Sequence, residues 1–235
     1  MADFNGSQPP GLKFAASARG LGGFVRQGMD HRKKAATGFA GLIGETFGLV
    51  TSTPQTLALP AAAAVGDLAV VMSGSNSGTT NSVTGAATVR FANYGSAYGY
   101  GVHSKVLTAA DLLSGLSLSG AGTGAWSIAV IRGGSVATYR GDAKSLSPAS
   151  DPACPGYVKS GTHKGTLAAF FSRSTETVAS PVGWLDGTAV GSTADVQWID
   201  WAVLLPPSAP IADNTPVVWV GAANGPTALS TYEFT

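Results

Sequence analysis

From about residue 47 onward, short apolar segments alternate with turn-forming residues at intervals of roughly ten, which strongly limits the possible folds. The segments are rich in β-branched and aromatic residues, as in "DLAVVMSGS" (67–75) and "AWSIAVIRG" (125–133). Gly, Ser, Pro, Asn or Asp separate them. We therefore predict an all-β fold, a jelly-roll-like β-sandwich. Only 108–116 is typical of a helical turn, with Thr108 as its cap and Asp111 at the third position.

One segment occurs twice in similar form. "GDLAVVMSGS" (66–75) and "GTLAAFFSRS" (165–174) share the pattern Gly-x-Leu-Ala-x-x-(Met/Phe)-Ser-x-Ser. Each precedes a polar loop, a pair of aromatic-bearing strands and a final apolar strand. Two buried strands that follow turns could share this pattern by coincidence. We favour a structural repeat over 58–135 and 160–234, in which two four-stranded halves build one jelly roll.

The first 45 residues differ from the rest and predict an extended N-terminal arm, followed by a body at 46–235. Gly and Pro lie among isolated large apolar residues, and neither helical nor strand periodicity persists. Residues 1–40 carry six basic and two acidic side chains, whereas the remainder carries eight and eleven. A basic arm on a slightly acidic body indicates an acidic partner.

We interpret this arm as a docking segment. Its large side chains would fill pockets on a partner, its glycines would allow close backbone approach, and its cations would pair with acidic rims. A mobile surface tail is the alternative. The candidate docking residues are Phe14, Arg19, Phe24, Arg26, Arg32, Lys33, Lys34, Phe39 and Leu42.

Other partners of the arm are less well supported. The Arg-Lys-Lys run at 32–34 is short for nucleic-acid binding, so nucleic acid is an unlikely partner. Glu45 interrupts the best apolar run, so we expect no membrane span.

Charged residues make up only 11% of the chain, against ~25% in soluble domains. This scarcity favours a protein whose surface is covered in an assembly.

Three segments carry a resemblance to a known group of proteins: "LPAAAAVGDLAVVMSGSN", "YGVHSKVLTAADL" and "GAWSIAVIRGG". Together they resemble a recurrent domain of tailed-phage and prophage virion proteins over about 58–135, with a weaker second copy at 160–234. The Pro-x-Gly-Trp motif usual in the first loop is absent there, although "SPVGW" (180–184) supplies it in the second copy. The resemblance implies a β-sandwich on a phage or gene-transfer-agent-like particle.

The sequence nominates no catalytic or metal centre. His31, His103 and His163 have no metal-ligand spacing, and Cys154 has no neighbouring base. "GSNSG" (74–78) places Asn76 where a nucleophile elbow needs serine. We therefore expect no enzyme activity, cofactor or metal.

Two further motifs concern recognition. Tyr94, Tyr98 and Tyr100 have the same parity and could form a flat face for a host glycan, or could be core residues. "RGD" (140–142) matches a receptor-binding tripeptide but is also ordinary turn chemistry. We expect Trp184, Trp198, Trp201 and Trp219 to be core or interface anchors.

These observations predict a virion structural protein, assembled in the bacterial host cytoplasm. An auxiliary capsid, decoration or head-spike protein is our first hypothesis, with the major capsid protein or tail components as partners in a homo-oligomeric or symmetric multi-copy assembly. A tail or fibre attachment component, or a carbohydrate-binding receptor-recognition module, is the alternative.

Overall fold

The fold is all-β, as the turn spacing predicted. The computed structural model describes residues 41–78, 81–93, 98–120, 122–134, 137–173, 178–192, 197–205 and 211–235. The helix predicted at 108–116 is present as α1 (Ala109–Ser114). Thr108 and Asp111 form the reciprocal capping box that the sequence indicated, which satisfies backbone donors at the start of this helix.

The first half of the body is a jelly roll. Its larger sheet has the strand order β1-β8-β3-β6-β5, and its smaller sheet has the order β2-β7-β4. In chain order these are the 1-8-3-6 and 2-7-4 pairings of a jelly roll, with the fifth strand added to the larger sheet. The strands are β1 (Leu42–Val50), β2 (Gln55–Leu57), β3 (Leu68–Ser75), β4 (Ser82–Val83), β5 (Ala87–Asn93), β6 (Gly99–Val106), β7 (Leu116–Ser119) and β8 (Gly124–Ile131).

The second half repeats this topology. Its larger sheet has the order β9-β18-β12-β15-β13, with β14 also paired to β15. On its outer side β10 pairs with β17, β11 pairs with β16, and Ala179 forms a bridge with Val220. The strands are β9 (Ala137–Ser145), β10 (Ala149–Ser150), β11 (Ala153–Cys154), β12 (Gly165–Ser172), β13 (Leu185–Asp186), β14 (Val190–Ser192), β15 (Gln197–Leu204), β16 (Val217–Val218), β17 (Ala222–Ala223) and β18 (Thr227–Phe234).

The two segments of similar sequence therefore occupy equivalent places. They form β3, the central strand of a five-stranded sheet, and β12, an inner strand of a six-stranded sheet. The strands with matching pairing order span 42–131 and 137–234, so the repeat is longer than the ranges we expected from the sequence. The four-stranded halves inferred from the sequence missed the short outer strands, since two-residue strands leave almost no sequence pattern.

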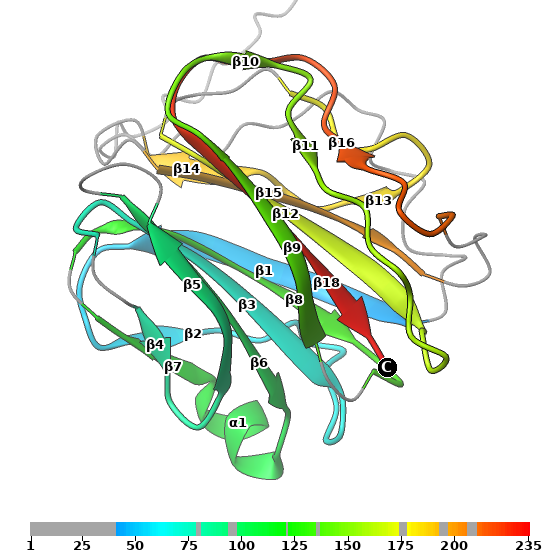
Figure 1. Ribbon diagram of the computed structural model, residues 1–235. Helices are drawn as coiled ribbons and strands as arrows, with labels where there is room; N and C mark the ends of the chain where they lie inside the picture. Colours follow the sequence, from blue (N-terminus) through cyan, green and yellow to red (C-terminus); the bar gives the residue numbers. More distant parts are fainter. Residues whose placement is uncertain are drawn as a thin grey trace, which may run out of the picture.

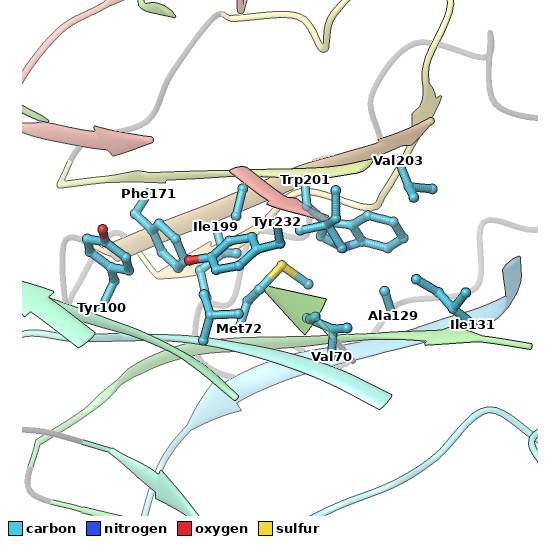
Figure 2. Close-up of a cluster of buried hydrophobic side chains, with 14 of the residues drawn as sticks. Val70, Met72, Tyr100, Ala129, Ile131, Phe171, Ile199, Trp201, Val203 and Tyr232 are labelled. Atoms are coloured by element: carbon cyan, nitrogen blue, oxygen red, sulfur yellow. The ribbon is translucent and has the colours of Figure 1, made fainter. Parts of the chain in front are cut away.

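The two jelly rolls pack with their larger sheets face to face (Figure 1). The shared core between them contains alternate residues of each central strand, including Val70 and Met72 from β3 and Phe171 from β12. Figure 2 shows these side chains meeting from the two sheets, with Trp201 and Tyr232 on the second-half side. This shared core makes the two repeats one folded body.

Each jelly roll also has an outer core between its larger and smaller sheets. The other face of β3 (Ala69 and Val71) belongs to the first outer core, and the other face of β12 (Ala168 and Phe170) belongs to the second. The body thus has four layers, and the central strands are buried on both faces. The expectation for the tryptophans is confirmed: three are buried (Trp198, Trp201 and Trp219), and Trp184 packs against the second outer core.

Polar contacts also join the two halves. Arg90 of β5 donates to Asp142 of β9 at 2.5 Å, and Trp201 Nε1 donates to Ser127 Oγ at 2.9 Å. Burial opposes ionisation of Asp142, but hydrogen bonds from Arg90 and Tyr139 outweigh burial and hold its pKa below the usual value. These polar contacts link the two halves around an otherwise apolar core.

Candidate docking site where the N-terminal segment joins the body

The described residues form a pocket of about 580 Å³ at the point where residues 1–40 join the body. Strand ends from both jelly rolls converge there, because β1 begins and β8 ends beside the start of β12 and the end of β18. The lining residues are Gly41, Leu42, Ile43, Ile131, Arg132, Gly133, Gly134, Lys164, Leu205 and Phe234.

The charged groups of this pocket are cationic. Arg132 donates from Nε and Nη2 to the two carboxylate oxygens of Asp67, both at 2.9 Å, so its charge is already paired. Lys164 donates from Nζ to the Gly133 carbonyl at 3.1 Å and forms no ion pair with a carboxylate of the described residues. Lys164 is therefore the group best placed to meet an acidic ligand atom at the rim.

The lining has the chemistry of a docking pocket. The residues around it are aliphatic, aromatic or glycine apart from Arg132 and Lys164, and none carries a carboxylate, imidazole, thiol or hydroxyl. Among these side chains, the Lys164 amine is the group that could act as a base or nucleophile, and it donates to the Gly133 carbonyl. The lining suits an apolar side chain with a carboxylate beside it.

The structure places one predicted docking residue differently. We assigned residues 1–45 to the arm, but β1 begins at Leu42, which pairs with Ile131 and packs against the shared core. Leu42 therefore belongs to the body, and the boundary lies near Gly41. The glycines at 41, 44 and 48 hid this strand, since glycine is depleted in strands. The other predicted docking residues, Phe14, Arg19, Phe24, Arg26, Arg32, Lys33, Lys34 and Phe39, lie outside the described residues.

The tyrosines do not form the predicted glycan platform as a set. Tyr100 is 1% exposed and stacks on Phe171 with ring centroids 4.5 Å apart, so it is a core residue. Tyr98 is half-buried against the shared core, with the Arg173 guanidinium 4.8 Å from its ring centroid. Tyr94 lies outside the described residues. The parity argument was correct for Tyr98 and Tyr100, but the face they share points mainly into the protein.

The Arg-Gly-Asp tripeptide lies in β9 and does not form a turn. Both of its charged side chains are engaged inside the molecule, since Arg140 binds Glu233 and Asp142 binds Arg90. A tripeptide held in this way cannot present its charges to a receptor.

Sequence reasoning missed a polar cluster around Glu233, whose side chain is fully buried in β18. Its carboxylate accepts hydrogen bonds from Arg140 Nε at 2.6 Å, from the Ser160 amide and hydroxyl at 2.8 Å each, and from His163 Nδ1 at 3.0 Å. Burial opposes ionisation, but these donors lower the pKa of Glu233. The partners are 70 or more residues away from Glu233 in sequence, so no local pattern could reveal the cluster.

This cluster contains Ser, His and Glu, but its geometry is not that of a hydrolase triad. A triad needs the imidazole between the hydroxyl and the carboxylate. Here Ser160 Oγ and His163 Nδ1 both bond to the same oxygen, Oε1 of Glu233. The imidazole therefore cannot accept the serine proton along a relay, and the arrangement acts as a structural anchor for the 160–163 loop.

The remaining titratable candidates are core residues. His103 is fully buried, its Nδ1 lies 3.2 Å from Thr88 Oγ1, and burial lowers its pKa to about 4. Cys154 is buried in β11, and burial raises the pKa of its thiol to about 11. A thiol with this pKa is a poor nucleophile near neutral pH.

Within the described ranges, no group of three or more His, Cys, Asp or Glu residues could hold a metal ion. No helix in this part of the chain has the length and apolar character needed to cross a membrane. No protein-family model, curated protein or solved structure matches the chain.

Proposed function

We propose that the protein is a structural component of a phage or phage-like particle, an auxiliary capsid, decoration or head-spike protein anchored by its N-terminal segment. The observation that carries this proposal is the division of the chain. A body of two packed jelly rolls follows a separate basic segment, and the two join at the edge of an apolar pocket.

Several features support a structural role. The segments at 58–135 resemble a virion domain, and the jelly roll is common among capsid proteins. Several charged side chains of the described part form internal ion pairs, as in Arg90–Asp142 and Arg140–Glu233. The low content of charged residues suits a protein that is covered in an assembly.

The chemistry of the N-terminal segment suggests the nature of its binding site. Its cations, such as Arg32, Lys33 and Lys34, would pair with acidic groups, and its isolated phenylalanines would fill apolar pockets. The partner surface would therefore be apolar with an acidic rim, on the major capsid protein or on a tail component.

The test is the copy number of the protein in purified particles. Quantitative gel analysis or mass spectrometry should find it in tens to hundreds of copies if it decorates a head. A copy number of six or fewer would instead place the protein in the tail. Complete absence from purified particles of a strain that expresses the protein would refute the proposal.

A further inference from the structure

Within the described ranges, strand β1 forms an open edge of the first jelly roll. It is the outermost strand of its sheet, it is nine residues long, and among the described residues it pairs with β8 alone. Its first eight residues are all half-buried, so the strand is partly accessible along almost its whole length. An open strand edge presents unpaired amides and carbonyls that another strand can bind.

Two hydrogen bonds identify the backbone groups that point outward. The Arg132 amide donates to the Gly41 carbonyl, so the backbone groups of Gly41 point toward β8. At the other end, the Leu49 carbonyl accepts instead from the side chain of Gln55. Backbone groups of successive residues in a strand point alternately toward and away from the neighbouring strand. When the extra residue in the bulge near Ile43 is allowed for, both hydrogen bonds give the same assignment of inward and outward residues. The backbone groups of Glu45, Phe47 and Leu49 point away from β8.

The other sheet edges carry protective features that β1 largely lacks. The equivalent edge of the second half, β9, contains Arg140, Asp142 and Lys144 and a bulge opposite Thr231 and Tyr232. Strand β5 contains Arg90 and a bulge, and β13 and β14 have only two and three residues. Charges, bulges and short length all discourage strand addition.

In β1 the only charged side chain is turned inward. The Glu45 carboxylate accepts from the Thr188 amide at 2.8 Å and from the Thr188 hydroxyl at 2.5 Å, across the interface with the second half. It therefore does not guard the edge. The bulge near Ile43 and the Gln55 contact at Leu49 leave the centre of the strand open between them.

The sequence of this strand identifies its occupant. "LIGETFGLV" reads similarly in both directions about Thr46: Leu42 matches Val50, Ile43 matches Leu49, and Gly44 matches Gly48. In a two-fold antiparallel pair centred on Thr46, each residue before Thr46 lies opposite the residue at the same distance after Thr46 in the other copy, so residues of similar size and polarity would meet. We propose that two copies of the chain associate by antiparallel pairing of their β1 strands, centred on Thr46.

This register agrees with the backbone directions. Glu45 lies opposite Phe47 of the second copy, and both have outward backbone groups, so they form a hydrogen-bonded pair. Thr46 lies opposite its own counterpart in a non-hydrogen-bonded pair, with Cα atoms about 4.5 Å apart. No like charges are directly opposite each other, whereas centring the pair on Glu45 would place two carboxylates opposite each other.

In this register Gly41 of one copy lies beside residue 51 of the other, so the pairing spans the whole of β1. One pair of nine-residue strands buries less than the about 1,200–2,000 Å² of a stable interface, so we expect a weak dimer that depends on concentration.

The first experiment is disulfide trapping of the full-length chain. Thr46→Cys should give a covalent dimer on mild oxidation, because the Cα separation of this pair lies within disulfide range. Thr51→Cys is the matched control, since in this register the two copies of residue 51 lie at opposite ends of the paired strands. Native Cys154 is buried and should remain unreactive. Equal trapping of both variants, or none, would overturn the proposal.

The second experiment measures association of the purified protein by sedimentation. Thr46→Lys places two like charges opposite each other and should raise the dimer Kd about fivefold or more. Thr84→Lys, which adds the same charge at another exposed site of the first half, should leave the Kd unchanged. Circular dichroism verifies that each variant is folded. A wild type that stays monomeric at its highest soluble concentration, or a folded Thr46→Lys variant with wild-type Kd, would contradict the proposal.

Discussion

Leu68 and Leu167 occupy equivalent positions in the two jelly rolls. Leu68 opens β3 and pairs with Val106 and Ile131, whereas Leu167 in β12 pairs with Val203 and Tyr232. Both leucines are buried in the shared core. The two halves therefore use matching residues of matching strands to bury each other.

The shared core predicts that neither half folds alone. A fragment of residues 41–134 would expose the face of its sheet that carries Val70, Met72 and Tyr100, whereas residues 41–235 should fold with β-type circular dichroism and one cooperative thermal transition. The fragment should instead bind a hydrophobic dye and melt without a sharp transition. A sharp, dye-free transition of the fragment would contradict this expectation.

Burial of His103 predicts a pH dependence of stability. Its folded pKa of about 4 lies below the unfolded value of about 6.5, so the unfolded state binds the proton first as the pH falls. The free energy of unfolding should decrease between about pH 6.5 and 4, by on the order of 3 kcal/mol in total.

The measurement is chemical unfolding at a series of pH values, for the wild type and for His103→Asn. The variant should be less stable at pH 7 but should have a flatter profile between pH 6.5 and 5. Asp67 and Asp142 have lowered pKa values, so their contributions are lost only at lower pH. A variant with the wild-type slope would show that another group causes the dependence.

Glu233 should contribute strongly to stability. Glu233→Ala would leave Arg140 without its partner and remove the acceptor for Ser160 and His163, so we expect a loss on the order of 3–5 kcal/mol. Asp213→Ala is the control, because Asp213 is the exposed member of its ion pair with Lys159 and should matter little. Thermal or denaturant unfolding would measure both. Similar small losses for the two variants would mean that the buried cluster is dispensable.

The docking hypothesis for the N-terminal segment predicts different effects of apolar and charged substitutions. Changing Phe14, Phe24 and Phe39 to Ala should weaken incorporation into particles at any salt concentration, because each buried anchor contributes about 1.5–3 kcal/mol. Reversing the charges of Arg32, Lys33 and Lys34 should have the smaller effect and should depend on salt, since an exposed ion pair contributes about 1 kcal/mol or less.

Particle incorporation at low and high salt, measured by gel, distinguishes the two sets of substitutions. Deletion of residues 1–40 should leave the body folded and abolish incorporation. If charge reversal alone releases the protein while the alanine changes have no effect, the segment is an electrostatic tether and nucleic acid becomes its better candidate partner.

The sequence predicted the fold class, α1 and most long strands, because those segments carry local apolar periodicity. It failed at β9, where "RGD" was taken as a turn motif. Arg140 and Asp142 are tolerated in this strand because Glu233 and Arg90 neutralise them from distant strands. Likewise the pocket depends on four strand ends from both halves, and contacts of such long range leave no local signal.

Gly41 and Phe234 line the same pocket, so the first and last parts of the folded body lie side by side. A reporter or cargo fused after residue 235 would therefore sit at the attachment end and would compete with whatever the N-terminal segment holds. The loops that follow Ser75 and precede Gly124 lie at the opposite end of the long strands. They are the better insertion points for displaying a foreign peptide away from the anchored surface.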